Sequence, residues 1–355
     1  LNIPSIDYGG GTGAILVEPQ RTNLYLHSND FTNILNNKVG MTALPNSINT
    51  VFGSLGGAKL MEVNLASTPR LNQGSPSTIG QIYTFSCFIK SGERNQVRIV
   101  MEGSANLSAY YNTDTGIISG IGALCTAKMK DFGGGWYRCI LTYTATASNN
   151  SAYVASANGS GSTIASGDNT KGFYVSDCQF ELGAVESSVI TTTTATVTRS
   201  TDSVLKSGIS SLIGQSKGTI FADINLTSLN KLSGILTVDG GSSPNFINIL
   251  IASTTLSIRF RKDSGVITTV MAYVIGSIGR LKIAVGYDAD NAQHVLVVNG
   301  SVVATSTNVV NFPTLPLSRA IIANPDYLYL GDSYNSCLLA DYKMSNEDLI
   351  KLTTL

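Results

Sequence analysis

Aromatic and planar polar residues alternate along two stretches of the chain in a pattern that suits sugar binding. Trp136 and Arg138 lie two positions apart in the first stretch, and Gln179 and Glu181 lie two positions apart in the second. Residues two apart share one face of a β-strand, so each pair would project from one surface. Aromatic rings stack on sugars, while charged and amide groups hydrogen-bond the hydroxyls. The pattern predicts a carbohydrate-binding face if the two stretches are neighbouring strands.

The same residues also admit a structural interpretation. The first pair would then pack beneath a loop or against a second domain, and the second pair would bind backbone groups. Because tryptophan is mostly buried in folded proteins, this interpretation is favoured for Trp136. Tyr110 and Tyr111 lie in a stretch of more variable appearance and are the alternative stacking residues.

Residues suited to catalysis are scarce. The chain has two histidines, His27 and His294, so a serine or cysteine triad would have to use one of them. The carboxylates Asp177 and Glu181 share a predicted strand face but lie about 13 Å apart at strand rise, beyond the roughly 5–10 Å of a glycosidase pair. We expect no catalytic residues and no enzymatic activity.

Motifs for cofactors and metals are also missing. Residues 9–13, Gly-Gly-Gly-Thr-Gly, lack the lysine and the spacing of a phosphate-binding loop. Residues 133–135, three glycines before a strand, predict a turn. Residues 288–291, Asp-Ala-Asp-Asn, suit a hairpin turn better than a cation site. We expect no cofactor and no metal ion.

The cysteines indicate a reducing environment rather than a disulfide framework. None forms a Cys-x-x-Cys pair, and their number is odd. Three lie in apolar, strand-like runs, where a thiol behaves as a small hydrophobic group. We expect all of them to be free: Cys87, Cys125, Cys139, Cys178 and Cys337.

Composition narrows the class of protein. The 355 residues carry 23 basic and 23 acidic side chains, so the net charge is zero. A neutral, low-charge chain argues against nucleic-acid binding and against disorder. No apolar run approaches the length that spans a bilayer, so no membrane insertion is expected. Leu1 to Pro4 shows neither a signal peptide nor an initiator methionine, which indicates missing or removed upstream residues.

Hydrophobic periodicity indicates an all-β chain. Tyr83, Phe85, Cys87 and Ile89 alternate with more polar residues and predict one buried strand face. Tyr137, Cys139, Leu141 and Tyr143 predict a second face, and Tyr174, Cys178, Phe180 and Leu182 predict a third. Many short two-faced strands are typical of sandwiches and barrels. We predict two antiparallel β-sandwich domains of jelly-roll type in tandem.

Local signals add detail to the second half. Asn299-Gly300 between two β-branched runs predicts a tight hairpin. Ser345, with Asp348 three residues on, predicts the start of a short helix. The Ser-, Asn- and Gly-rich stretch 147–168 predicts a long surface loop. The polar, threonine-rich stretch 187–207 predicts a domain boundary near residue 205.

Three stretches resemble the jelly rolls of phage fibre, spike and tail proteins. The first runs from Ile6-Asp7-Tyr8-Gly9 through Glu18-Pro19-Gln20-Arg21-Thr22-Asn23-Leu24 to Ser28-Asn29-Asp30-Phe31. The second joins Tyr83–Lys90 with Gly135-Trp136-Tyr137-Arg138. The third runs from Gln179-Phe180-Glu181-Leu182-Gly183 to Val197-Thr198-Arg199-Ser200-Thr201-Asp202. These motifs cover residues 3–204 in the expected order.

The remainder resembles a laminin-G or concanavalin-A-like module by pattern. The matching features include residues 218–222, the Asn299-Gly300 hairpin, residues 329–331 and the closing run 342–352. Two departures stand out: Val189-Ile190-Thr191-Thr192 lacks the usual proline, and no acidic cluster matches a lectin calcium site. With both resemblances, the expected organisation is an extended segment at 1–23, a carbohydrate-binding-like jelly roll at 24–204, a linker at 205–211 and a laminin-G-like sandwich at 212–355.

The resemblance implies a function that composition does not show. It implies a non-enzymatic phage virion appendage, made in the host cytoplasm and displayed on the virion surface. Its expected partners are host cell-surface polysaccharide and other virion proteins, and fibres and spikes are commonly homotrimers. Two alternatives remain open: a virion decoration protein that binds only other virion proteins, or the binding module of a glycan-degrading enzyme.

Overall fold

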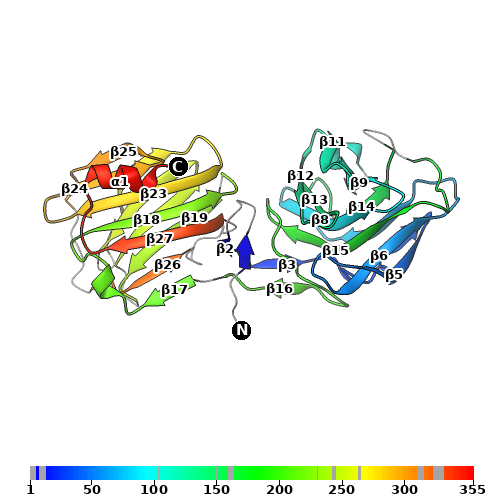
Figure 1. Cartoon of the computed structure of the whole chain (residues 1–355), viewed down its shortest axis with the longest axis horizontal. Coiled ribbons are helices and arrows are strands. Elements are labelled where there is room, and N and C mark those ends of the chain that lie inside the picture. Colours follow the sequence, from blue (N-terminus) through cyan, green and yellow to red (C-terminus); the bar gives the residue numbers. More distant parts are fainter. Residues whose placement is uncertain are drawn as a thin grey trace. The chain divides into compact units, whose positions relative to one another are not determined.

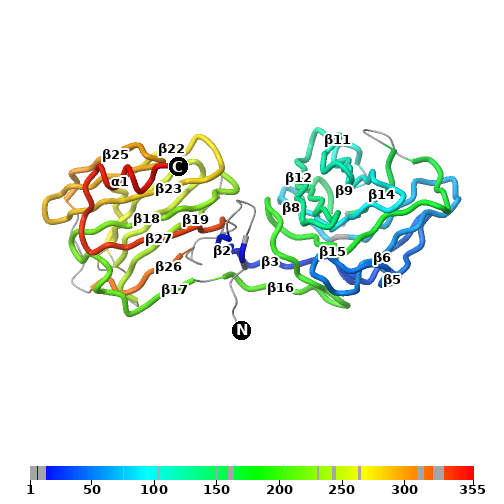
Figure 2. Tube along the Cα trace, in the orientation of Figure 1, coloured from blue at the N-terminus to red at the C-terminus, as the bar shows by residue number. Residues whose placement is uncertain are grey.

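A computed structural model shows two compact units connected by two crossings of the chain (Figure 1; the chain trace is in Figure 2). It describes residues 5–7, 13–102, 104–148, 150–158, 164–202, 204–229, 231–241, 245–262, 265–309, 316–322 and 332–355. One unit is Arg21–Arg199, here called the inserted domain; the other combines Leu1–Gln20 with Ser200–Leu355 and is called the split domain. Of the sequence expectations, the glycine run at 9–12 and the motif at 329–331 lie outside the described residues.

The inserted domain is a sandwich of two antiparallel sheets, each with six strands in the described part of the chain. The first sheet runs in the order β11 (Ile117–Ile121), β10 (Ser108–Asn112), β9 (Gln96–Met101), β14 (Asn150–Ser156), β7 (Arg70–Ser75), β4 (Asn37–Val39). The second sheet runs in the order β12 (Cys125–Asp131), β13 (Trp136–Thr144), β8 (Ile82–Ser91), β15 (Gly172–Leu182), β6 (Leu55–Glu62), β5 (Met41–Asn49). A short pair, β3 (Arg21–Asn23) with β16 (Val197–Arg199), and the 3-10 turn Ala105–Leu107 complete it.

The core between these sheets confirms the first two predicted strand faces. Cys87 lies directly opposite Cys139, and Phe85 lies opposite both Leu141 and Phe180. The predicted core residues all belong to one cluster, with Tyr137 partly buried and the others no more than 5% exposed: Tyr83, Phe85, Cys87, Tyr137, Cys139 and Phe180. The cysteines at 87, 125, 139, 178 and 337 are free. Burial raises the pKa of the Cys139 and Cys178 thiols well above the ordinary value.

A β-bulge corrects one predicted face. Tyr174 was expected to share a face with Cys178 and Phe180, but the ladder between β15 and β8 shifts register between Ser176 and Gln179. Asp177, inside this bulge, has a φ of 50°. The extra residue reverses the alternation, so Tyr174 points away from the core that contains Cys178.

The split domain is a second sandwich. In the described residues, one sheet runs in the order β1 (Ser5–Asp7), β2 (Ala14–Val17), β27 (Asp332–Ala340), β18 (Lys217–Leu226), β23 (Gly279–Asp288), β24 (Gln293–Val298), β25 (Ser301–Ser306). The other runs in the order β17 (Val204–Ser207), β26 (Arg319–Ile322), β19 (Lys231–Asp239), β20 (Phe246–Ser253), β21 (Thr255–Arg261), β22 (Thr268–Val274). The 3-10 turn Ser210–Leu212 precedes β18, and the helix α1 (Asn346–Thr353) packs through Leu349 on the outer side of the first sheet (Figure 1).

Two local predictions in this domain are confirmed. Asn299 and Gly300 connect β24 to β25 with φ values of 46° and 78°, as a tight hairpin turn between twisted strands requires. Ser345 caps α1, since its side chain accepts a hydrogen bond from Asp348 N. The described part of the chain contains no helix that is both long and apolar enough to cross a membrane.

The expected domain boundaries need correction at both ends of the split domain. The segment predicted as extended, 1–23, contributes β1 and β2, and β2 pairs with β27 near the other end of the chain. The stretch predicted as a linker, 205–211, contains most of β17, which pairs with β26. Thus the inserted domain interrupts a sandwich whose strands come from both sides of it.

The stretch 147–168 also differs from its prediction as a surface loop. This stretch contains the strand β14, which lies between β9 and β7 in the first sheet. Ala152 and Val154 of this strand are each 1% exposed. Alanine and serine fit this strand because larger neighbours fill the core around it, so composition alone was misleading.

The core assignment makes Phe85 a test of the inserted domain. Replacing Phe85 by Ala should lower the free energy of unfolding by about 3–5 kcal/mol, because a fully buried ring leaves a cavity. Chemical denaturation of the full chain measures this change. Ile121→Ala, at a side chain that is 52% exposed, is the control and should change stability little; equal losses in both variants would contradict the proposed core.

Candidate functional site

The residues predicted to form a sugar-binding face do lie on adjacent strands. Arg138 of β13 pairs with Phe88 of β8, and Gln179 of β15 pairs with Ser86 of β8. Their side chains therefore share the outer side of the second sheet of the inserted domain. This part of the prediction, that the two stretches are neighbours, agrees with the structure.

Their exposure does not agree with it. Trp136 is 4% exposed, Arg138 5%, Gln179 1% and Glu181 0%. These side chains project outward from their strands but are not open to solvent, because segments from earlier and later in the chain cover this side of the sheet. The structural interpretation of these residues is the one that the burial supports, and a glycan cannot reach them in this conformation.

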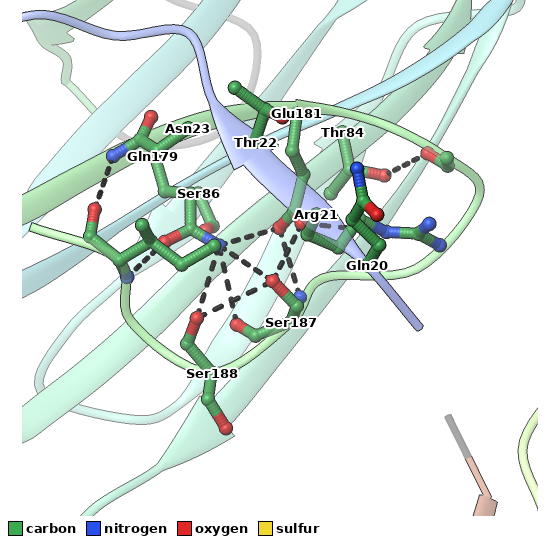
Figure 3. Close-up of polar contacts among 12 residues, drawn as sticks. Gln20, Arg21, Thr22, Asn23, Thr84, Ser86, Gln179, Glu181, Ser187 and Ser188 are labelled. Carbon is green, nitrogen blue, oxygen red and sulfur yellow. Dashed lines mark hydrogen bonds and ion pairs between the residues drawn. The ribbon is translucent and has the colours of Figure 1, made fainter. Parts of the chain in front are cut away.

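Glu181 is the centre of the covering interactions (Figure 3). Its Oε1 accepts hydrogen bonds from Gln179 Nε2 at 2.8 Å and from Ser187 N at 2.9 Å, and its Oε2 accepts from Ser187 Oγ at 2.7 Å. Arg21 Nε lies 3.6 Å from Glu181 Oε2. Burial raises the pKa of Glu181 above its ordinary value, although these bonds and the charge of Arg138 oppose the shift. Glu181 thus fastens β3 and the segment after β15 to the sheet.

Gly183 allows this close approach. It has a φ of 135°, and a Cβ built there would lie 2.6 Å from Arg21 Nη2. A side chain would displace the guanidinium from Glu181. The motif residues around Arg21 and those around Glu181, far apart in the sequence, therefore meet at one place in the fold.

Asn23 extends the same connection. Its Nδ2 donates to Cys178 O and Ile190 O, and its Oδ1 accepts from Tyr25 N and Phe180 N. Every polar atom of this amide is used inside the protein. The opening and closing segments that carry the phage-protein resemblance are therefore framework in this chain.

Arg138 is buried among three carboxylates. It donates to Ser86 Oγ at 3.2 and 2.9 Å, and its guanidinium lies 5.5 Å from the ring centre of Phe88. Its charge lowers the pKa of Asp177, Glu181 and Glu186. Burial dominates at the first two and leaves their pKa values raised. At Glu186 the ion pair with Lys130 at 2.6 Å and the charge of Arg138 outweigh burial, so its pKa is lowered.

Trp136 and Tyr111 complete the set of buried candidates. Trp136 packs beside Gly57, where a built Cβ would lie 3.5 Å from the indole and 2.7 Å from Ile48. Tyr111 is 0% exposed, belongs to the core and donates its hydroxyl to Ile140 O at 2.5 Å. Burial raises its pKa well above the ordinary value. Neither residue is a stacking platform in this structure.

Tyr110 lies on a different surface, the outer face of the first sheet. It is 8% exposed and pairs with Arg98 of β9. The guanidinium of Arg98 lies 5.1 Å from its ring centre, and its Cδ2 would lie 3.4 Å from a Cβ at Gly120. Of the six predicted residues, Tyr110 alone lies on the outer face of the first sheet, beside the partly exposed side chain of Arg98.

We call this surface the Arg/Tyr face. Its residues alternate with core residues along β7, β9, β10 and β14, so they share the outer side of the sheet. All but Tyr110 are partly exposed. The face comprises Arg70, Asn72, Gln96, Arg98, Tyr110, Asn112 and Tyr153.

Two arginine–tyrosine pairs organise the Arg/Tyr face. Arg98 contacts Tyr110, and the guanidinium of Arg70 lies 5.8 Å from the ring centre of Tyr153. Arg70 and Arg98 both pair with Ala155, one from each side. The small alanine therefore separates two long cationic side chains. Rings, amides and guanidinium groups on one surface are the chemistry expected of sugar binding.

Sequence reasoning missed most of this face for identifiable reasons. The alternation of Gln96 and Arg98 with Val97 and Ile99 was a usable signal. Tyr153 was hidden because its strand was predicted as a loop.

Candidate metal ligands do not gather in the described part of the chain. No cluster of three or more His, Cys, Asp or Glu side chains there could hold a metal ion. Residues 133–135 form a turn with φ values of 78°, 60° and 81°. Asp288 accepts hydrogen bonds from Asn291 N and Nδ2, as expected of a hairpin turn.

His294 has a structural environment. It is 3% exposed, and its Nε2 lies 3.1 Å from Asn308 O, so the neutral ring donates there. Its Nδ1 is buried without a hydrogen-bond partner among the described residues. Burial lowers the pKa of His294, Lys343 lowers it further and Asp288 opposes the shift.

Comparisons with known proteins add little at the level of sequence. The chain matches no protein-family model, and no curated protein matches it at a significant level. Solved structures that are similar include the CBM40 of the Ruminococcus gnavus IT-sialidase bound to α2,3-sialyllactose, at 19% identity and a TM-score of 0.34, covering 42% of this chain and 98% of that chain.

Two further similar structures have the same low scores. The K499G mutant of NanB sialidase from Streptococcus pneumoniae is 16% identical with a TM-score of 0.36, covering 43% of this chain and 27% of that chain. The W1238A mutant of HCR/D is 7% identical with a TM-score of 0.33, covering 39% and 37%. At these values the similarity supports no conclusion about binding. What is established is an all-β chain of two antiparallel sandwiches.

The charge cluster gives a stability prediction. Replacing Arg138 by Met should lower the free energy of unfolding at pH 7 by about 3–5 kcal/mol, because buried carboxylates lose their compensating cation. The loss should shrink towards pH 5, since Asp177 and Glu181 already have raised pKa values and protonation removes the uncompensated charge. Denaturation at both pH values measures this.

Lys130→Met provides the control. The Lys130 side chain is 56% exposed, and its partner Glu186 keeps the charge of Arg138 nearby, so this variant should lose less stability than Arg138→Met does. An Arg138→Met loss that is equal at pH 7 and pH 5 would show that packing, rather than charge, makes Arg138 important.

His294 gives a second pH prediction. An unfolded histidine titrates near pH 6.5, whereas the folded pKa of His294 lies lower. Below about pH 6.5 the unfolded chain therefore binds a proton that the folded chain resists, and stability falls. His294→Gln, which keeps a donor for Asn308 O, should lose less stability than wild type between pH 7.5 and 5.5. An unchanged loss would contradict the assignment.

Proposed function

We propose that the chain is a non-enzymatic phage virion appendage that binds host surface glycans through the Arg/Tyr face. The phage part rests on the resemblance of residues 3–204 to fibre, spike and tail proteins. The glycan part is carried by one observation: two tyrosine rings, two guanidinium groups and three amides share one side of a sheet.

The proposed location of the protein is the virion surface, with a homotrimer as its proposed assembly. Exposed apolar side chains support contact with other chains. Phe52 is 60% exposed and Phe132 is 44% exposed, and both rings pack on Phe88 at 5.7 and 4.9 Å between centroids. Contiguous exposed aromatic groups are typical of protein interaction sites.

Each glycan contact should be weak alone. One partly exposed ring supplies about 1–3 kcal/mol of apolar contact, and each hydrogen bond to a hydroxyl adds about 0.5–1.5 kcal/mol net. Added together, a few such contributions give a dissociation constant on the order of millimolar to tens of micromolar. Several copies on one virion would raise the effective affinity by roughly 10²–10⁴.

Tyr153→Ala tests this function. We expect the affinity for host polysaccharide to fall about tenfold, because the ring supplies stacking area. We also expect the purified variant to block phage adsorption less than the wild type does. Glycan binding and adsorption are both measured on the full chain, and an unchanged melting temperature shows that the fold is retained.

Tyr174→Ala is the matched control. Tyr174 is a partly exposed tyrosine with Lys59 Nζ 5.5 Å from its ring centre, but it lies on the outer side of the other sheet. Equal weakening by both variants, or no glycan binding by wild type, would contradict the proposal. Glycan binding without any effect on adsorption would favour the binding module of a glycan-degrading enzyme.

A further inference from the structure

We infer that the Arg/Tyr face selects acidic glycans, with a sugar carboxylate bound between Arg70 and Arg98. This inference rests on the proposed function and specifies its ligand class. It depends on three features of the face. Its strands lack acidic residues, its two arginines form no ion pair with a described residue, and these arginines are suitably spaced.

The strands that form the face lack acidic residues. The sequences of β11, β10, β9, β14, β7 and β4, as the described residues define them, contain no Asp or Glu. The opposite sheet of the same domain contains four, at Glu62, Asp131, Asp177 and Glu181. The charge on the face is therefore cationic, although the whole chain is neutral.

Neither arginine of the face is neutralised. Arg98 donates Nη2 to Ser108 Oγ at 2.9 Å, and its Nε has no hydrogen-bond partner among the described residues. Arg70 donates Nη1 to Thr68 O at 3.4 Å. Neither forms an ion pair with a described residue, whereas other arginines of the chain are paired with carboxylates: Arg94 with Glu62, Arg280 with Asp223 and Arg319 with Asp239.

The spacing of the arginines suits one carboxylated sugar. Both pair with Ala155, so they lie two strands apart, which is roughly 10 Å. Ala155 between them is 1% exposed, so the longer side chains around it close over its methyl group and form the surface that a ligand would meet. The guanidinium groups of Arg70 and Arg98 lie 5.8 and 5.1 Å from the ring centres of Tyr153 and Tyr110. A guanidinium binds a carboxylate in a planar, two-bond geometry. A uronic acid can thus contact a guanidinium through its carboxylate and Tyr153 through its ring.

A glycan fits this face better than a nucleic acid does. Binding to a phosphate backbone relies on many cations along a path, and the Arg/Tyr face has two. Its remaining polar side chains are the neutral amides of Asn72, Gln96 and Asn112, which match sugar hydroxyls. Binding of single-stranded or duplex DNA in place of the glycan would overturn the inference.

The test compares acidic glycans with their neutral counterparts. A panel of uronate-containing bacterial polysaccharides is prepared together with the same polysaccharides after chemical reduction of the carboxylates to alcohols. The full chain should bind the acidic member of a pair at least tenfold more tightly. The double variant Arg70→Gln/Arg98→Gln should lose this preference while it retains weak binding to the reduced member. Tyr153→Ala should weaken both members of a pair.

Arg259→Gln/Arg261→Gln is the charge-matched control. These arginines are also partly exposed, but they belong to β21 of the split domain. If this control, rather than the Arg70/Arg98 variant, removes the preference, the acidic site is elsewhere and the inference is wrong. Equal loss in both variants would indicate non-specific charge attraction and would also overturn it.

The remaining outcomes separate the inference from the proposed function. Equal binding of acidic and reduced members, weakened by Tyr153→Ala, would overturn the inference and leave glycan binding intact. Binding of neither acidic, reduced nor untreated neutral polysaccharide would overturn both. A melting temperature for each variant excludes unfolding as the cause of any loss.

Discussion

The fold of the inserted domain depends on how it accommodates one fully buried carboxylate. Glu181 is 0% exposed in the middle of a sheet face, and an isolated charge there would be strongly destabilising. Gln179 and Ser187 supply its hydrogen bonds, and Arg21 Nε lies 3.6 Å from its Oε2. These partners lie on β15, after β15 and near the start of the domain. Satisfying one side chain therefore brings both ends of the domain onto the sheet.

This arrangement gives the two sheets different properties. On one sheet, the charge cluster around Arg138 and the covering segments turn the outer side into a second, polar core. Ser86, Phe88 and Glu181 are each 0% exposed there. On the other sheet, strands without acidic residues leave Arg70 and Arg98 uncompensated at the surface. The two sheets thus differ in charge: carboxylates are buried on one, and two arginines without an ion pair to a described residue lie on the other.

The sequence was informative where local physics decides the structure. Period-two alternation identified the core face of β8 and β13, Asn299-Gly300 identified a hairpin, and Ser345 identified a helix start. The sequence was misleading where contacts with distant segments decide the structure. Alternation says which side of a strand Trp136 occupies but not whether another segment covers that side. The bulge at Asp177 reversed a face, and no local signal announced it.

The domain organisation shows the same limit on a larger scale. Composition placed a boundary near residue 205, close to the observed crossing at 199–200, because polar residues do mark where the chain leaves a domain. It could not show that β2 pairs with β27, since a strand of four residues has no signal for a partner more than 300 positions away. That pairing has a consequence for folding. The inserted domain contains all of its own strands and can form first, whereas the split domain needs both flanking segments. An inserted domain already folded brings residues 20 and 200 together, since β3 pairs with β16 immediately inside them. It thereby shortens the loop that the split domain must close. The polar contacts that fix Arg21 and Asn23 in the inserted domain therefore also help the other sandwich to form.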